Sequence, residues 1–174
     1  WMNDKLLDTV AELPKVCEHI EVPVQSGDDD VLRNMKRGYT QQDYRDLIAM
    51  IRSKIPDCSI ATDIIVGFPG ETEKAYQELK SYVAESGFDR VAAFLYSDEE
   101  DTTAQSLDDK IERSVMEERR NELLAIQEGI ASGRGQDRIG SVMEVLIEGP
   151  SEETPLLLEG RHEGLAPEID GVVY

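Results

Sequence analysis

The sequence has little cysteine, few aromatic residues and no long apolar run. Its only cysteines, Cys17 and Cys58, stand far apart without a CxxC spacing, so we predict two small, buried, unpaired side chains in a reducing compartment. No stretch approaches the roughly 20 apolar residues that cross a bilayer, and the amino end lacks the apolar core of a signal peptide. We therefore expect a cytoplasmic protein with no membrane partner.

Basic residues are also scarce. The 174 residues include 18 Lys and Arg against 37 Asp and Glu, which gives a formal net charge of −19. Nucleic-acid phosphates are held by clustered Lys and Arg, so this balance argues against unaided nucleic-acid binding. It is compatible with a basic protein partner, and simple solubility is the alternative explanation.

The most informative stretch is ATDIIVGFPGET, residues 61–72. Ile64–Val66 is a β-branched run typical of a strand buried on both faces of a parallel sheet. A glycine- and proline-rich turn ends it, and Thr72 can cap a following helix. Asp63 on the strand and Glu71 at its exit are candidate functional residues, because chemistry in α/β folds collects at the carboxyl ends of strands. A polar strand end and a favourable charge at a helix N-terminus explain the same two residues without a function.

Helix and strand patterns alternate over the first part of the chain. Strands are predicted at 20–24, 59–66 and 91–96, and helices at 4–10, 28–35, 40–55 and 72–86. This order predicts an α/β fold with parallel strands and right-handed crossovers. Three strands do not close a barrel, so we expect the carboxyl-terminal part of a larger domain.

The pattern changes after residue 111. A charged helix is predicted from Glu112 to about Ser132, ended by the glycines of Gly133-Arg134-Gly135. Short strand candidates at 141–147, 155–158 and 172–174 suggest a small, truncated all-β module. The predicted organisation is thus 1–111, a linker helix at 112–135, and 136–174.

Three phrases, HIEVPVQSGDDDVLRNMKRGYT, ATDIIVGFPGET and FLYSDEEDTTA, occur in this order and together resemble the radical-SAM methylthiotransferases. The resemblance implies a partial (β/α) TIM-like radical-SAM barrel followed by an OB-like TRAM domain. It implies S-adenosylmethionine and two 4Fe–4S clusters in the intact enzyme. The CxxxCxxC loop of the family is not in this sequence, so the chain alone is expected to be inactive, with no catalytic or metal-ligating residue. Asp101 also replaces a glycine usual in the third phrase, which puts the backbone there in doubt.

The resemblance also implies a cofactor site at the strand ends. Gln25, Ser26 and Asp63 would offer hydrogen bonds to S-adenosylmethionine, and Gly67 would allow its adenine or ribose to approach the backbone. Glu71 completes the predicted set of cofactor-binding residues. Ser26 could equally cap the following turn.

One branch of this family modifies an adenosine in tRNA, and another modifies the β-carbon of an aspartate in a small-subunit ribosomal protein. The terminal GRHEGLAPEIDGVVY, the YSDEE loop and an acidic β module favour the second branch, whereas MKRGYT and VPVQSGDDDVL look as much like the first. An acidic module suits a basic ribosomal protein and would repel tRNA. The module's acidic residues are Glu144, Glu148, Glu152, Glu153, Glu159, Glu163, Glu168 and Asp170. We expect a monomer; the alternatives are the tRNA enzyme and a non-catalytic acidic binding module.

Two histidines could suggest catalysis. His19 precedes a predicted strand, where a structural hydrogen bond is the favoured role, and His162 is predicted to be a solvated turn residue.

Overall fold

The computed structural model describes residues 2–167 and 169–174, so Trp1 and the acidic residue Glu168 lie outside the described part. Its elements follow the predicted alternation, and Thr40 and Asp43 form a capping box. In chain order they are α1 (Asp4–Glu12), β1 (His19–Glu21), α2 (Asp29–Asn34), α3 (Gln41–Lys54), β2 (Ser59–Val66), α4 (Glu73–Ser86), β3 (Arg90–Leu95), the 3-10 helix η1 (Thr103–Ser106), α5 (Arg113–Asp137), β4 (Leu146–Pro150) and β5 (Leu158–Arg161).

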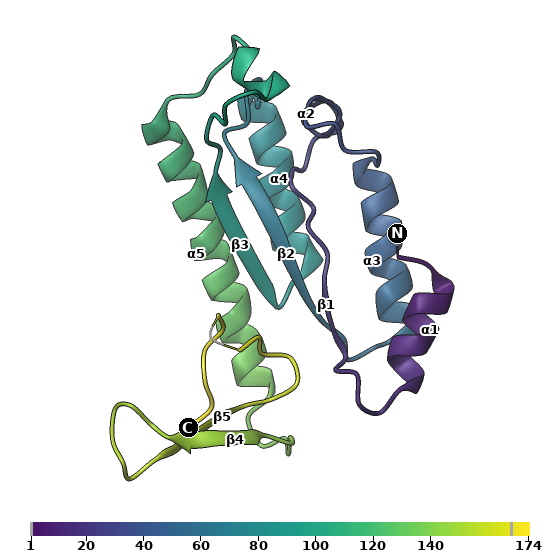
Figure 1. Cartoon of the computed structure of the whole chain (residues 1–174), viewed down its shortest axis with the longest axis vertical. Helices are drawn as coiled ribbons and strands as arrows, with labels where there is room; N and C mark the ends of the chain where they lie inside the picture. Colours follow the sequence, from purple (N-terminus) through teal and green to yellow (C-terminus); the bar gives the residue numbers. More distant parts are fainter. Residues whose placement is uncertain (1, 168) are drawn as a thin grey trace.

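Strands β1, β2 and β3 form a parallel sheet in that order, as predicted. Helices α3, α4 and α5 lie along one side of these strands, and the other side is open (Figure 1). On β2, Ile60, Ile64 and Val66 are fully buried under the helices, whereas Asp63 and Ile65 on the opposite face are half-buried. The prediction that this strand is buried on both faces is therefore wrong, because helices cover only one of them.

The core between sheet and helices is apolar with an aromatic centre. The rings of Tyr44 and Phe88 each meet the ring of Tyr82 edge-on, at centroid distances of 6.0 and 5.8 Å. The Tyr44 hydroxyl donates a hydrogen bond to the Val22 carbonyl at 2.6 Å, which fixes the chain beyond β1 against α3. This core holds the strand ends in a defined position.

Helix α5 runs further than its sequence predicts. The glycines at 133 and 135 were expected to end it, but it continues to Asp137. The side chain of Arg134 pairs with Asp89 and donates to the Gly87 carbonyl at 2.5 Å. These contacts hold the last turns of α5 against the start of β3 and offset the poor helix propensity of glycine.

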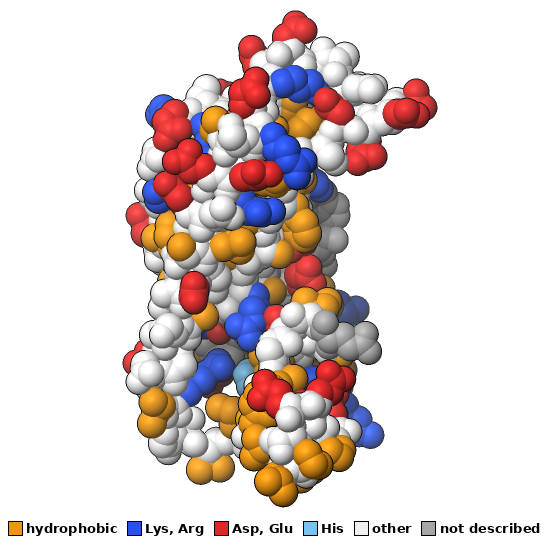
Figure 2. All heavy atoms as spheres, turned by 90° about the vertical axis from the view of Figure 1, so that its left-hand side faces the viewer, with side chains coloured by type: hydrophobic (Ala, Val, Ile, Leu, Met, Phe, Trp, Pro, Cys, Tyr) orange, Lys and Arg blue, Asp and Glu red, His pale blue; other side chains and the backbone are white. Residues whose placement is uncertain are grey.

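Strands β4 and β5 pair antiparallel after α5. Both begin later than predicted, and the third predicted strand contributes only a bridge between Val173 and Gly160. An ion pair between Arg90 and Asp170, 2.9 Å long, ties this module to β3. Hydrophobic side chains gather at the end of the molecule that carries β4 and β5 (Figure 2).

Cys58 is buried as predicted, but Cys17 is exposed, because the loop between α1 and β1 lies at the surface. Neither residue forms a disulfide. Among the helices of residues 2–167 and 169–174, none is both long and apolar enough to cross a membrane.

Candidate functional site

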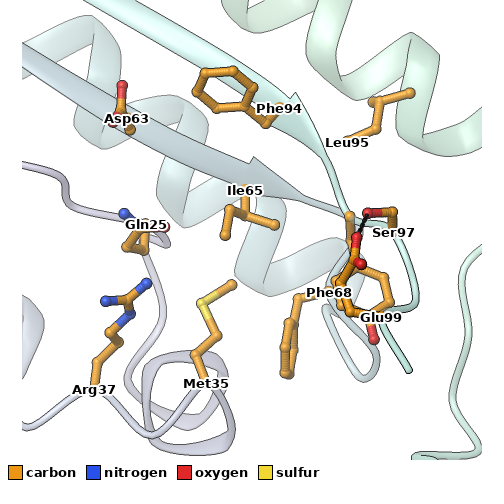
Figure 3. A pocket seen from close by; sticks show the side chains of 11 residues that line it. Gln25, Met35, Arg37, Asp63, Ile65, Phe68, Phe94, Leu95, Ser97 and Glu99 are labelled. Atoms are coloured by element: carbon orange, nitrogen blue, oxygen red, sulfur yellow. Dashed lines mark hydrogen bonds between the residues drawn. The ribbon is translucent and has the colours of Figure 1, made fainter. Parts of the chain in front are cut away.

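A cavity of about 400 Å³ lies on the open face of the sheet, at the carboxyl ends of β2 and β3 (Figure 3). This volume is within the range of small-molecule pockets, about 300–1,000 Å³. Its walls combine apolar and aromatic side chains with a few polar ones, as such pockets usually do. The lining residues are Gln25, Met35, Arg37, Asp63, Ile65, Phe68, Phe94, Leu95, Tyr96, Ser97 and Glu99.

Gln25 extends the first strand along β2. Its N–H donates to the Asp63 carbonyl at 2.9 Å, and its own carbonyl accepts from the Ile65 N–H at 3.0 Å. Its φ of 66° lies in the left-handed region, which non-glycine residues adopt at a cost and often at functional sites. The turn directs the Gln25 side chain into the cavity (Figure 3).

Asp63 is the second predicted residue that lines the cavity. Burial raises the pKa of its carboxyl above the usual value, and the neighbouring carboxylate of Glu21 raises it further. The sheet thus brings Gln25 and Asp63 together on one face, as the prediction of a shared site requires.

Ser26 does not line the cavity. It is 1% exposed, its carbonyl accepts from the Gln41 side chain at 2.5 Å, and its hydroxyl accepts from the Asp28 N–H at 3.4 Å. These contacts match the alternative in which Ser26 stabilises the turn before α2.

Gly67 and Glu71 also face away from the cavity, toward α5. Gly67 has a φ of +80°, and a Cβ added to it would stand 2.4 Å from Cγ of Met116. Glu71 accepts from the Gly67 N–H at 3.2 Å and pairs with Arg119 at 2.7 Å. Burial raises the pKa of Glu71 despite the guanidinium beside it. The packing of α5 is by itself sufficient reason for a glycine and a carboxylate here, and cofactor contact by any of the five residues stays a prediction.

Sequence reasoning missed the wall opposite Asp63. Met35 and Arg37 follow α2, and Phe94 lies on β3 directly beside Ile65. An aromatic residue on a predicted strand was the available signal, and Phe94 is 55% exposed on the open face of the sheet. No comparable feature of the sequence predicted that the residues after α2 line the cavity.

His162 is not the solvated turn residue that was predicted. Its Nδ1 accepts from the Gly164 N–H at 3.1 Å, its Nε2 lies 3.5 Å from Nη1 of Arg138, and the residue is half-buried. Burial, reinforced by Arg138 and Arg90, lowers the pKa of this imidazole. A structural hydrogen bond was predicted for His19, but its Nδ1 is buried without a hydrogen-bond partner among the described residues.

A parallel sheet with a cavity at its strand ends, followed by a small antiparallel module, is the arrangement of a radical SAM segment joined to a TRAM domain. The Radical SAM superfamily model matches residues 1–83, and the TRAM domain model matches residues 139–174. The radical SAM enzyme coproporphyrinogen III oxidase (HemN) of Escherichia coli superposes with a TM-score of 0.55 over 77% of this chain and 30% of its own, at 22% identity. That likeness concerns the fold alone.

The curated relatives give a more specific family assignment than this likeness in fold. The ribosomal protein uS12 methylthiotransferase RimO of Syntrophotalea carbinolica is 45% identical over 99% of this chain, and those of Myxococcus xanthus and Aquifex aeolicus are 42% and 45% identical over 98% and 99%. The chain spans 36–40% of the length of these three relatives. It is a RimO-like radical SAM methylthiotransferase segment with a TRAM domain, which confirms the predicted family.

Proposed function

We propose that the protein containing this chain attaches a methylthio group to the β-carbon of an aspartate in ribosomal protein uS12. The observation that carries this proposal is the 45% identity to a uS12 methylthiotransferase across both the radical SAM segment and the TRAM domain. We place the reaction in the cytoplasm, where ribosomes are assembled. Within it, this chain would supply one wall of the cofactor pocket and the module that meets the substrate protein.

The cavity suits a nucleoside cofactor. Ile65, Phe68 and Phe94 offer an apolar surface to an adenine ring, while Gln25 and Asp63 offer polar groups for the ribose or the amino-acid part. These residues would bind and orient S-adenosylmethionine and exclude water from it. When bound, the cofactor and two 4Fe–4S clusters would supply the radical chemistry and the transferred sulfur.

The chain's own thiols do not fit a cluster. Within residues 2–167 and 169–174, no three His, Cys, Asp or Glu side chains converge to hold a metal ion. Burial raises the pKa of Cys58 to about 11, which disfavours the thiolate that iron requires. We therefore assign no step to Cys17 or Cys58.

The charge of the TRAM domain supports a basic protein partner. Glu148 pairs with Arg161 and Asp170 with Arg90. The remaining described carboxylates of this set form no ion pair with a described residue; they are Glu144, Glu152, Glu153, Glu159 and Glu163. Uncompensated negative charge attracts a basic ribosomal protein and repels tRNA phosphates.

The test uses the full-length protein with its clusters, incubated with uS12 or with tRNA. We expect mass spectrometry to find one methylthio group on an aspartate of uS12 and none on tRNA. Modification of tRNA alone would contradict the proposal in favour of the adenosine-modifying branch. Failure to modify either, with intact clusters, would favour the non-catalytic binding module.

A matched pair of variants tests the docking role. Replacing Glu152, Glu153 and Glu163 by Gln should weaken uS12 binding and reduce its salt dependence. Replacing the exposed Glu12 of α1 and the exposed Glu118 and Glu128 of α5, all outside the TRAM domain, by Gln removes the same charge and should leave binding nearly unchanged. Equal effects of both sets would show that only total charge matters.

A further inference from the structure

His162 and Arg138 bring two hydrogen-bond donors together. Nδ1 of His162 accepts from the Gly164 N–H at 3.1 Å, so the proton of the neutral imidazole lies on Nε2. The neutral form is favoured, because burial, reinforced by Arg138 and Arg90, lowers the pKa of this ring. Nη1 of Arg138, which is always protonated, lies 3.5 Å from that Nε2. Two N–H groups therefore meet, and neither can accept a hydrogen bond from the other.

The neighbouring carboxylate of Asp89 does not supply the missing acceptor. One of its oxygens accepts from the Ile60 N–H at 2.9 Å, and the other pairs with Arg134. That second oxygen lies 3.9 Å from Nη2 of Arg138, which is beyond hydrogen-bond distance. Among the described residues, no carboxylate accepts a hydrogen bond from the Arg138 side chain.

A cavity of about 180 Å³ lies at this point, where α5, the start of the parallel sheet and the TRAM domain meet. This volume exceeds the roughly 30 Å³ of one water molecule, but it is smaller than the about 300–1,000 Å³ of pockets for larger ligands. Figure 2 shows a histidine in a hollow with Lys or Arg side chains around it, near the end that carries β4 and β5. The size of the cavity therefore suits a small ion.

The cavity carries positive charge in a strongly acidic protein. Asp89 lies among its lining residues, and Asp170 pairs with one of the lining arginines at 2.9 Å. Three guanidinium groups against these two carboxylates leave one positive charge in excess, whereas the whole chain has a net charge of −19. Glu163 is exposed and forms no ion pair with a described residue. The lining arginines are Arg90, Arg134 and Arg138.

We propose that this cavity binds a small oxyanion, which accepts hydrogen bonds from Nε2–H of His162 and from the guanidinium of Arg138. The ion supplies the acceptor that the two donors lack and balances the excess positive charge. A guanidinium group matches phosphate and carboxylate oxygens alike, so these are the two forms that the experiment distinguishes. Arg138 directly follows α5 and His162 belongs to the TRAM domain, so the bound ion joins this domain to the helix before it.

Isothermal titration calorimetry with the full-length protein measures binding of inorganic phosphate and of acetate, with chloride holding the ionic strength constant. Arg138→Gln should weaken the bound oxyanion about tenfold or more, because a charged hydrogen-bond donor is lost. Arg138→Lys should retain part of the affinity, since it keeps the charge but not the planar fork. Arg113→Gln is the matched control, because it removes the same charge from α5, where Arg113 pairs with Glu117 in solvent.

His162→Asn tests the second donor. An asparagine oxygen can still accept from the Gly164 N–H, but Nε2–H is withdrawn from the cavity, so the same ion should bind about two- to tenfold more weakly. Binding of phosphate alone or of acetate alone assigns the form of the ion. If neither ion binds the wild type, or if Arg138→Gln and His162→Asn bind it as tightly as Arg113→Gln, water satisfies the two donors and the inference is overturned. Modification of uS12 does not enter this result, so the proposed function stands or falls separately.

Discussion

Nη1 of Arg119 lies 2.7 Å from Oε1 of Glu71, and the two side chains are 8% and 1% exposed. Arg119 also donates to the Glu71 carbonyl at 3.2 Å and to Glu73 at 3.0 Å, and its guanidinium lies 4.9 Å from the ring centre of Tyr76. This cluster joins the middle of α5 to the loop that leaves β2. The loop beside the candidate site is therefore positioned by a helix that begins more than forty residues later in the chain.

Arg119→Met removes this charge while keeping most of the side-chain volume. Because Glu71 would be left buried and unpaired, the free energy of unfolding should fall by about 3–5 kcal/mol. Urea denaturation at neutral pH measures it. The loss should shrink as the pH falls toward the raised pKa of Glu71, since protonation removes the buried charge.

Arg113→Met is the matched control on the same helix. Arg113 pairs with Glu117, but their side chains are 81% and 45% exposed, so the pair is screened by solvent. Its loss should cost less than about 1 kcal/mol. Similar losses in both variants would contradict a special role for the buried pair.

Gly67→Ala tests why a glycine ends β2. The added Cβ would meet Met116 at 2.4 Å and force a side chain into the left-handed region, so we expect a loss of about 2–4 kcal/mol. Gly70→Ala is the control, because Gly70 has a φ of +85° with nothing within 4 Å of an added Cβ. Its free energy of unfolding should fall only by the cost of placing a side chain in the left-handed region, about 1–2 kcal/mol.

Repeating Gly67→Ala in the Met116→Ala variant separates the packing explanation from the cofactor-binding explanation. In Met116→Ala the clash is absent, so Gly67→Ala should cost about as little as Gly70→Ala, measured by the same denaturation. If the cost of Gly67→Ala is small in both backgrounds but S-adenosylmethionine binding is lost, the glycine serves the cofactor and the packing explanation is wrong.

Local signals were sufficient for much of the fold. Thr40 and Thr72 accept the hydrogen bonds expected of helix caps, and β2 spans the predicted 59–66, because caps and strand patterns depend on neighbours in sequence. The end of α5 was predicted incorrectly because Arg134 contacts Asp89 and Gly87 just before β3, and helix propensity does not include such contacts. Tertiary contacts override local preference there.

The site was predicted in part for the same reason. Gln25 and Asp63 meet because parallel strands end at one edge, a rule that follows from topology. Arg37 could not be found, since its place depends on a Schellman motif with lysine at the position that usually holds glycine. Glu71 and Gly67 were predicted to bind the cofactor, which stays a prediction, and their side-chain and close contacts in the structure lie with α5.

Asp101 stands where the family resemblance leads us to expect glycine, and its backbone has the left-handed conformation that glycine commonly adopts. Its φ is 64°, in the left-handed region, and its side chain is exposed. Asp101→Gly should therefore raise the free energy of unfolding by up to about 1 kcal/mol. Glu100→Gly, at a neighbour whose φ is not positive, should lower it slightly. Thermal denaturation of both variants distinguishes relief of strain from a general effect of glycine, and stabilisation by neither would contradict this explanation.

His162 should make the stability of the chain depend on pH. Its imidazole faces the guanidinium groups of Arg138 and Arg90 and the carboxylates of Glu163 and Asp89; burial and the two arginines outweigh the carboxylates and lower its pKa below the usual 6.5. The unfolded chain therefore binds this proton more readily than the folded one. Its contribution to stability is complete above about pH 6.5 and is lost as the pH falls toward the lowered pKa.

His162→Asn isolates this effect, because an asparagine oxygen can replace Nδ1 as acceptor for the Gly164 N–H. Melting temperatures from pH 5 to pH 8 should fall more steeply toward acid for the wild type than for the variant. The difference between the two curves removes the contribution of other titrating groups, including the raised carboxyl of Glu71, which acts in the opposite direction. Parallel curves would mean that His162 titrates equally in the folded and unfolded chain, and that its burial beside Arg138 does not favour the neutral imidazole.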